Sequence, residues 1–263
     1  MKSVLVTGAY GGMGRETVNL LKAQGVRVFA LDLKVEDAEE NVIPVVADLT
    51  SEESVREAFS VVREQTDNLY AIIHFAGIYR LDSLVEMESG AFDRIFDINV
   101  RGAYLVNKTF LPLLGEGSRI LMTTSELAPL DPLPFTGIYA VTKAALDRYA
   151  YSLAMELQLL GVKVSVLRAG AVDTGMLGVS TSALDRFCDK TALYSCNASR
   201  FKSIVEGVEA RCVPPKRIAE KCAQIIGKKH PAFAYSINRN PLLLLLNLLP
   251  KRLQLFAIKV VLK

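Results

Sequence analysis

The sequence predicts an α/β fold in which a single doubly wound parallel sheet carries helices on both faces. Short, continuous apolar runs such as Ser3–Val6 and Val26–Leu31 alternate along the chain with helical patterns. This alternation is typical of parallel sheets, because their strands are buried on both faces and are joined by crossover helices. At 263 residues the chain is long enough to form one domain with a sizeable core.

Each element of this fold is predicted from the local spacing of apolar residues. We expect strands at the β-type apolar runs over residues 2–7, 26–31, 42–47, 70–75, 118–124, 162–168 and 232–236. We expect helices where the pattern is helical, over residues 12–24, 51–66, 91–112, 138–160 and 215–228. We find no internal repeat or low-complexity tract before residue 241.

The composition argues against a metalloprotein and against a secreted protein. The two histidines, His74 and His230, are far apart in the chain, and the four cysteines have no CxxC spacing. We therefore expect no metal site, and we expect cysteines that stay reduced in a cytosolic chain. Because the first residues lead directly into a strand, we expect no secretory signal and a cytoplasmic location. We also expect no nucleic-acid partner.

A glycine-rich turn lies between the first predicted strand and the first predicted helix. It reads Thr7-Gly8-Ala9-Tyr10-Gly11-Gly12-Met13-Gly14. Glycines let a backbone approach a pyrophosphate closely, and the free N–H groups of the following helix receive the phosphate charge. An ordinary turn between strand and helix can also be rich in glycine, but the strand before it and the helix after it favour nucleotide binding.

An acidic residue ends the second predicted strand. Asp32 follows Val26–Leu31 and lies 18 residues after Gly14, near the position of a carboxylate that accepts the ribose hydroxyls of adenosine. Such a carboxylate repels a 2′-phosphate, and residue 11 is glycine rather than a cation. Lys34 is the one nearby residue that could offset this repulsion. We therefore expect NAD(H) rather than NADP(H), the alternative being that Asp32 is a solvated loop residue.

Tyr139 and Lys143 lie four residues apart in a stretch of helical propensity. That spacing places them one turn apart on the same helix face. A lysine ammonium beside a phenol favours the phenolate and lowers the pKa of the tyrosine, which suits proton transfer near neutral pH. Such pairs also arise by chance on protein surfaces, so the glycine-rich turn gives this pair its significance.

These motifs belong to a series that resembles the short-chain dehydrogenase/reductase family from residue 1 to about residue 235. The family's TGxxxGxG motif is matched by Thr7, Gly8, Gly12 and Gly14. Its other motifs are matched, in the family's order, by Asp48, His74-Phe75-Ala76-Gly77, Asn99, Ser125, Tyr139 with Lys143, and Ala169 to Thr174.

Three positions depart from the family pattern. Phe75 replaces the second asparagine of Asn-Asn-Ala-Gly, which we expect to alter local hydrogen bonding without abolishing activity. Ala169 replaces a proline. Ser125 precedes Tyr139 by fourteen residues where the family more often has thirteen, so Thr124 is the alternative if the register shifts by one.

The resemblance implies a Rossmann-like fold and hydride transfer between a nicotinamide and a carbinol carbon. Tyr139 would be the general acid or base, Lys143 would bind the nicotinamide ribose, Ser125 would hold the substrate oxygen, and Asn99 would hold a water on a proton path. The residues implied to bind the cofactor are Gly8, Gly12, Met13, Gly14, Asp32, Asp48, Leu49, Ala76, Gly77, Tyr139, Lys143, Val172 and Thr174.

The substrate is predicted less directly. In the family the segment after Thr174 closes over the substrate, and here it runs over about residues 175–215 of a nucleotide-binding and catalytic domain at 1–240. Its apolar residues, including Met176, Leu177, Val179, Leu184 and Phe187, favour a hydrophobic alcohol or ketone such as a steroid or lipid, although they could also serve to pack the segment on the body. The alternatives are a 3-oxoacyl carrier-protein reductase, a sugar-type alcohol dehydrogenase or epimerase, and a non-catalytic nucleotide-sensing regulator.

The family also implies a homodimer or homotetramer that pairs through the helices at 91–112 and 138–160. The second helix has an apolar stripe at helical spacing, which belongs either to the interface or to the core. The stripe consists of Tyr149, Ala150, Leu153, Ala154 and Leu157.

The C-terminal tail, residues 241–263, is both apolar and basic. It begins with five consecutive leucines, Leu242–Leu246, and Pro250 interrupts it. Residues 216–263 hold ten Lys or Arg and one acid. The leucine run is shorter than the ~20 residues that span a bilayer. This pattern predicts peripheral contact with a membrane, docking on a partner subunit, or a helix folded over the substrate mouth.

Overall fold

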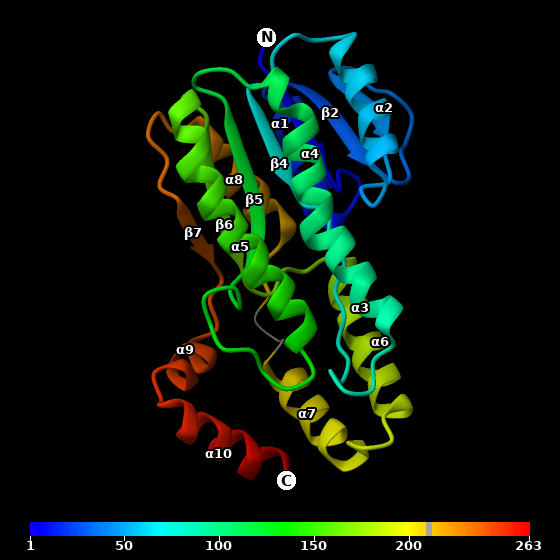
Figure 1. Ribbon diagram of the computed structural model, residues 1–263, viewed down its shortest axis with the longest axis vertical. Helices are drawn as coiled ribbons and strands as arrows, with labels where there is room; N and C mark the ends of the chain where they lie inside the picture. Colours follow the sequence, from blue (N-terminus) through cyan, green and yellow to red (C-terminus); the bar gives the residue numbers. More distant parts are fainter. Residues whose placement is uncertain (209–211) are drawn as a thin grey trace.

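The protein, described by a computed structural model over residues 1–208 and 212–263, is built around a seven-stranded parallel sheet (Figure 1). The strand order is β3-β2-β1-β4-β5-β6-β7. The strands are β1 (Ser3–Thr7), β2 (Arg27–Asp32), β3 (Val42–Val46), β4 (Ala71–His74), β5 (Arg119–Ser125), β6 (Lys163–Ala169) and β7 (Ala234–Ile237). This order, parallel throughout, confirms the predicted Rossmann-like α/β fold.

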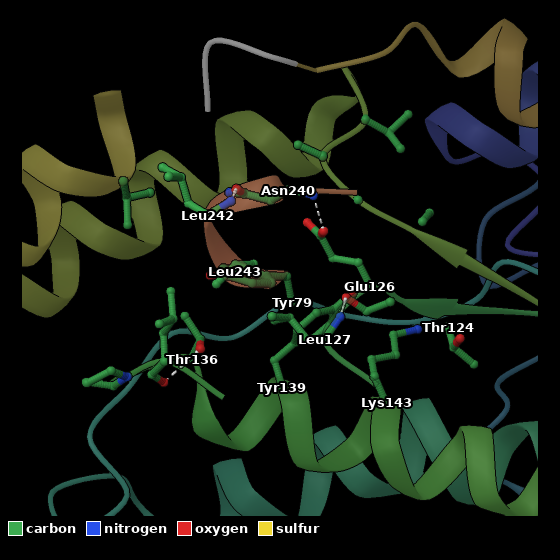
Figure 2. Close-up of a pocket in the computed structure, with 18 of the residues that line it drawn as sticks. Tyr79, Thr124, Glu126, Leu127, Thr136, Tyr139, Lys143, Asn240, Leu242 and Leu243 are labelled. Carbon is green, nitrogen blue, oxygen red and sulfur yellow. Dashed lines mark hydrogen bonds between the residues drawn. The ribbon is translucent and has the colours of Figure 1, made fainter. Parts of the chain in front are cut away.

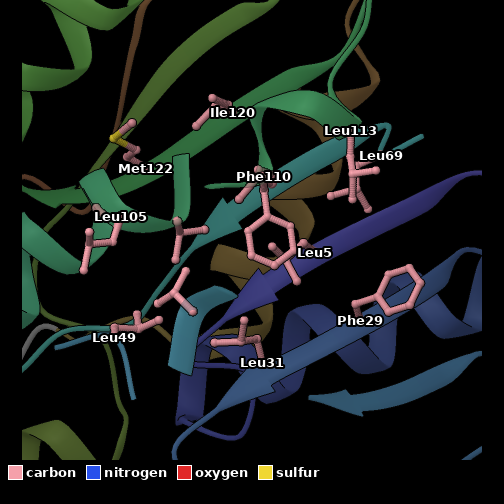
Figure 3. Close-up of a cluster of buried hydrophobic side chains, with 14 of the residues drawn as sticks. Leu5, Phe29, Leu31, Leu49, Leu69, Leu105, Phe110, Leu113, Ile120 and Met122 are labelled. Atoms are coloured by element: carbon pink, nitrogen blue, oxygen red, sulfur yellow. The ribbon is translucent and has the colours of Figure 1, made fainter. Parts of the chain in front are cut away.

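Helices cover both faces of the sheet, and each face has its own hydrophobic core. The helices at the predicted positions are α1 (Gly12–Ala23), α2 (Glu52–Arg63), α3 (Ser89–Phe96), α4 (Gly102–Phe110), α5 (Gly137–Leu157) and α8 (Pro215–Gly227). One core joins the sheet to α2, α4 and α5, and the other joins it to α1 and α8. Strand side chains alternate between them: Leu5 points into the first core (Figure 3), while Val4 and Val6 point into the second.

The order of the strands positions a crevice. From β1 the chain builds β2 and β3 on one side of β1. It then returns to the other side with β4, so the connections that follow β1 and β4 run in opposite directions along the sheet. In open α/β sheets, ligands bind outside the carboxyl ends of the strands at such a switch point. Residues 8–14 follow β1 and residues 75–77 follow β4, so both predicted nucleotide motifs lie at this point.

Four further helices lie beyond the carboxyl ends of the strands, where we expected a loop and a tail. They are α6 (Gly175–Lys190), α7 (Ser195–Val208), α9 (Pro241–Asn247) and α10 (Lys251–Leu262). We predicted no helix within residues 175–215, which was wrong, because α6 and α7 both lie there. These helices depend on contacts between distant parts of the chain. Leu184, Phe187, Phe201 and Leu262 form a third hydrophobic core that stabilises α6, α7 and α10. Figure 1 shows α7, α9 and α10 at the end of the molecule farthest from the N-terminus.

Candidate active site

The glycine-rich turn borders a cleft of about 700 Å³ at the carboxyl ends of β1, β2, β3 and β4. Gly8 has a φ of +66°, which favours glycine. A Cβ on Gly14 would lie 2.0 Å from the Gly8 carbonyl oxygen, and a Cβ on Gly12 would lie 2.8 Å from the Thr174 Cβ. The packing thus leaves no room for a side chain at Gly8, Gly12 or Gly14. The backbone N–H groups at the start of α1 can therefore approach a phosphate closely.

Two carboxylates lie along the same cleft. Asp32 accepts hydrogen bonds from the backbone N–H groups of Tyr10 (3.0 Å) and Leu33 (2.8 Å), which fix its position at the end of β2. Asp48 accepts bonds from the backbone N–H and the hydroxyl of Thr50, and these bonds hold its carboxyl pKa below the ordinary value. The cleft fits the adenosine half of a dinucleotide, with Leu49, Ala76 and Gly77 also in its wall.

Ser125, Tyr139 and Lys143 line a second cavity, of about 450 Å³. Figure 2 shows Tyr139 and Lys143 side by side on α5. The Tyr139 phenol forms a hydrogen bond with Ser125, and its ring packs against the Tyr79 ring with centroids 4.9 Å apart. The Lys143 Nζ lies 5.7 Å from the Tyr139 ring centroid and donates to the Thr123 carbonyl oxygen at 3.2 Å. Helix α5 therefore presents the tyrosine and the lysine to the same cavity from adjacent turns.

The structure distinguishes Ser125 from its alternative, Thr124. The Thr124 hydroxyl donates to Asp147 at 3.2 Å, and Asp147 is paired with Arg168 at 2.7 Å. Ser125 is the residue that contacts the Tyr139 phenol. The geometry therefore favours Ser125 as the residue that faces a substrate oxygen.

Asn99 is buried and held at three points. Its Oδ1 accepts from the Ile78 N–H at 2.8 Å, and its Nδ2 donates to the Ile78 carbonyl at 3.0 Å and to the Thr142 hydroxyl at 3.1 Å. It lies in a π-helical turn, η1 (Asp97–Arg101), between α3 and α4. Such turns often occur at functional sites because they redirect one side chain. Gly77 packs against both Asn99 and Lys143, since a Cβ there would lie 3.2 Å from Asn99 Oδ1 and 3.5 Å from Lys143 Nζ.

Burial sets the protonation of the two central groups. Burial raises the pKa of Tyr139 above its ordinary value; the nearby Tyr79 raises it further, and the bond to Ser125 partly opposes the rise. Burial also lowers the pKa of Lys143 to about 8. The expected depression of the Tyr139 pKa by Lys143 was therefore wrong for the protein alone, because both groups are buried and the cost of removing charge from water dominates.

The cleft and the cavity meet beside the reactive side chains. The residues that line both are Met13, Phe75, Gly77, Ile78, Tyr79 and Thr174. Val172 lies in the wall of the cavity next to this junction. Phe75, which stands where the family has asparagine, is buried and donates its backbone N–H to the Thr7 carbonyl oxygen at 3.0 Å. A dinucleotide in the cleft would reach the cavity at this junction.

The rest of the cavity wall comes partly from the C-terminal tail, as in the predicted alternative of a helix folded over the substrate mouth. Leu242, Leu243 and Leu246 of α9 and Ala257, Ile258 and Val261 of α10 line it, so the tail forms part of the wall. Glu126 lines it too and accepts a bond from the Asn240 N–H at 2.6 Å. The position of Glu126 next to Ser125 was the only sequence signal for it. The side chains of Met176, Leu177 and Val179 lie outside the described part of the structure.

Comparison with known proteins identifies the family. The family of short chain dehydrogenases matches residues 2–185. The chain belongs to this family. It is 33% identical to the uncharacterised oxidoreductase YbbO of Escherichia coli K12, over 90% of this chain and 85% of that protein. It is 34% identical to mouse estradiol 17-beta-dehydrogenase 2, over 67% of this chain and 50% of the mouse enzyme.

A solved structure confirms the fold. The 3-ketoacyl-(acyl-carrier-protein) reductase of Brucella melitensis, complexed with NADH, aligns with a TM-score of 0.73 at 21% identity, over 90% of this chain and 96% of that chain. Membership of the short-chain dehydrogenases makes the protein an oxidoreductase of a family that uses NAD or NADP. Across the described residues, no helix is long and apolar enough to cross a membrane, and no group of three or more His, Cys, Asp or Glu is placed to hold a metal ion.

Proposed function

We propose that this short-chain dehydrogenase uses NAD(H) to interconvert a secondary alcohol and a ketone on a hydrophobic substrate. The observation that carries the proposal is the junction of the two cavities, where a nucleotide-sized cleft meets an apolar chamber beside Tyr139, Lys143 and Ser125. A dinucleotide and an apolar substrate can therefore meet beside these side chains.

The chain's own residues would manage the proton and the substrate. Bound NAD(H) supplies the hydride acceptor or donor. In reduction, the Tyr139 hydroxyl gives its proton to the carbonyl oxygen as the carbonyl carbon gains hydride, and in oxidation both move in reverse. Ser125 holds the substrate oxygen by a hydrogen bond. Lys143 would bind the nicotinamide ribose. Asn99, which is fixed on Ile78 and Thr142, would position a water that links Lys143 to solvent.

The preference for NAD(H) rests on the end of β2. The Asp32 carboxylate is held at the cleft by two backbone N–H groups, where it would accept ribose hydroxyls and repel a 2′-phosphate. Arg15, a nearby cation, is engaged by both oxygens of Glu36, at 2.5 and 3.1 Å. Gly8, Gly12, Met13 and Gly14 would receive the pyrophosphate, and Val172 and Thr174 the carboxamide.

The substrate class rests on the chamber wall. Leucine, isoleucine and valine side chains from α7, α9 and α10 line the side away from the sheet, and Glu126 is a carboxylate among them. An apolar wall with a few polar groups at one end favours a substrate with one oxygen function on a hydrophobic body. Steroid-like and lipid-like alcohols or ketones meet that description.

The test is binding followed by turnover. Purified protein is titrated with NADH and with NADPH by fluorescence, and steroid, fatty and sugar alcohols are then screened with the cofactor that binds. We expect tighter NADH binding and turnover of an apolar substrate that Tyr139→Phe lowers by at least ~100-fold. Tyr151→Phe is the matched control, because Tyr151 is exposed on the same helix and lines neither cavity.

Other outcomes would overturn parts of the proposal. Tighter NADPH binding with turnover of a 3-oxoacyl thioester would indicate a carrier-protein reductase. Turnover of sugars alone would indicate a sugar-type alcohol dehydrogenase or epimerase. NADH binding without turnover of any alcohol or ketone would indicate a nucleotide-sensing regulator.

We also propose that the protein forms a homodimer or homotetramer through the outer surface of α4 and α5. The stripe that we considered for the interface, Tyr149 to Leu157, packs on the core instead. Different apolar side chains are exposed on these helices, among them Tyr104, Val141 and Met155. Light scattering of the native chain and of Val141→Asp tests this proposal. A native chain with the mass of a monomer, or a variant with the same oligomeric mass as the native chain, would refute it.

A further inference from the structure

The C-terminal tail presents two apolar faces, of which the fold uses one. On α10, Ala257, Ile258, Val261 and Leu262 face the cavity, and Gln254 on the same side is buried. Leu253, Leu255, Phe256 and Val260 face away from it, with Leu255 72% and Phe256 65% exposed. A surface helix of a soluble domain needs only its inner stripe to be apolar. The second face is therefore unexplained by folding.

The tail cannot turn its outer face inward, because polar contacts fix it to the body at both ends. The Asn240 N–H donates to Glu126 at 2.6 Å, and the Asp131 N–H donates to Asn247 Oδ1 at 2.7 Å. Asp131 also forms an ion pair with Lys251. At the far end the Asn197 side chain donates to the Leu262 carbonyl oxygen at 2.6 Å. The outer apolar side chains thus stay in solvent unless something covers them.

Three residues of the cavity wall are themselves exposed to solvent. Leu242, Ile204 and Val261 each line the cavity and are also exposed, at 61%, 40% and 53%. These residues belong to three different helices, α9, α7 and α10, and all three are apolar. The cavity is therefore bordered by exposed apolar side chains of all three helices. In Figure 2, Leu242 and Leu243 lie on the far side of the cavity from α5.

The charge of the tail indicates what kind of partner covers the outer face of α10. Residues 241–263 contain Lys251, Arg252, Lys259 and Lys263 and no acidic residue. Arg252 and Lys259 of α10, and Lys263 directly after it, are exposed, and their spacing places them on the side of Phe256. A helix whose exposed side combines large apolar residues with cations is suited to the interface of an anionic bilayer, where apolar side chains enter the acyl boundary and cations meet the headgroups.

We propose that the outer face of α9 and α10 rests on an anionic membrane, and that the cavity takes its apolar substrate from the bilayer through the rim of Leu242, Ile204 and Val261. The uptake part rests on the proposed function, whereas the docking part does not. The two helices, of 7 and 12 residues, lie on the bilayer rather than span it. The catalytic side chains stay above the surface.

The docking part is tested by co-sedimentation of the full chain with vesicles of phosphatidylcholine containing phosphatidylglycerol. The apolar variant is Leu253→Gln/Phe256→Gln/Val260→Gln, whose positions line no cavity described above. The charge variant is Arg252→Gln/Lys259→Gln/Lys263→Gln. The matched control is Leu159→Gln/Leu160→Gln, which removes exposed apolar side chains at the opposite end of the molecule.

We expect the native chain and the control to bind, and each tail variant to lower the partition coefficient at least tenfold. Binding should also fall with added salt and with the loss of phosphatidylglycerol. Circular dichroism establishes that the variants are folded. If the native chain stays in the supernatant, or if the tail variants bind as the control does, docking is refuted. A change of mass in the apolar variant, with no vesicle binding by the native chain, would show that the face joins two copies instead.

The uptake part is tested with whichever alcohol the screen identifies. Turnover of a long-chain substrate held in vesicles should fall at least tenfold in the apolar variant, while turnover of a short, soluble analogue stays within twofold of native. Equal loss on both substrates would refute uptake from the bilayer. Failure of the proposed function would instead appear as absence of turnover in the native chain, with vesicle binding intact.

Discussion

Replacement of Gly14 by alanine should open the turn that holds the cofactor. The added Cβ would lie 2.0 Å from the Gly8 carbonyl oxygen and 2.9 Å from the Ala9 Cα. Both neighbours are backbone atoms, so neither can rotate away, and the turn must separate from the start of α1. Gly11 provides the matched control, since its φ is −73° and a Cβ there meets nothing closer than 3.4 Å.

The expected cost follows from the overlap. Forcing a methyl group into packed backbone costs about 1–3 kcal/mol, which lowers the melting temperature of a domain of this size by roughly 2–12 °C. The same displacement moves the N–H groups that would receive the pyrophosphate, so NADH affinity should fall at least ~10-fold. Gly11→Ala removes backbone freedom at a compatible φ and should change the free energy of unfolding by less than ~1 kcal/mol.

Two measurements test whether the turn holds the cofactor. They are thermal unfolding without cofactor and fluorescence titration with NADH. Gly14→Ala should unfold at a lower temperature and bind NADH more weakly, while Gly11→Ala stays near the native chain in both. If Gly14→Ala matches Gly11→Ala in melting temperature and affinity, the turn does not cradle the cofactor as the packing requires.

Three further predictions follow from single groups. Asp32→Ser should weaken NADH binding about tenfold and strengthen NADPH binding, so the ratio of the two Kd values shifts toward NADPH; an unchanged ratio would place Asp32 outside the ribose site. Because burial lowers the pKa of Lys143 to about 8, kcat/KM for reduction should decline above about pH 8 as the ammonium is lost, and a profile flat to pH 10 would contradict that role. His74 is buried with a pKa of about 4, against about 6.5 when unfolded. Between pH 6.5 and pH 4 the unfolded chain therefore binds a proton at His74 that the folded protein does not bind. Urea unfolding should show a free energy of unfolding ~2 kcal/mol lower at pH 5 than at pH 7. His74→Gln should remove most of this difference.

The sheet could be predicted from the sequence because its signals are local. Each strand is a short apolar run buried on both faces, and the glycine-rich turn has its meaning from the strand before it and the helix after it. Predicted and observed strand ends differ by one or two residues, as at β1, where the prediction began at residue 2 and the strand begins at Ser3. The spacing of Tyr139 and Lys143 likewise survives in the structure, since one helix fixes it.

Three of the distal helices, α6, α7 and α9, could not be predicted because no local pattern determines them, whereas a helix in the tail after Pro250 was among the alternatives. Helix α9 is a run of five leucines between Pro241 and Asn247, so its sequence marks no apolar face, and its inner side is defined by the cavity that it covers. Helices α6 and α7 are stabilised by contacts with residues as distant in sequence as Leu81 and Leu262. The apolar stripe of α5 was ambiguous for the same reason, because spacing alone does not distinguish a face on the core from a face on a partner.

The protonation of the active site also depends on three-dimensional burial, and it bears on the direction of catalysis. A lysine beside a tyrosine in water would lower the tyrosine pKa, but here both lie in one buried wall, so Tyr139 keeps its proton and Lys143 loses its own more easily. A protonated phenol is the form that donates to a ketone oxygen. The raised pKa of Tyr139 therefore disfavours the phenolate that would accept a proton from an alcohol, and a positive charge beside the ring would favour that phenolate. Oxidation should consequently be the more pH-dependent direction, rising with pH as the phenol is released from its proton, whereas reduction should be independent of pH below about 8.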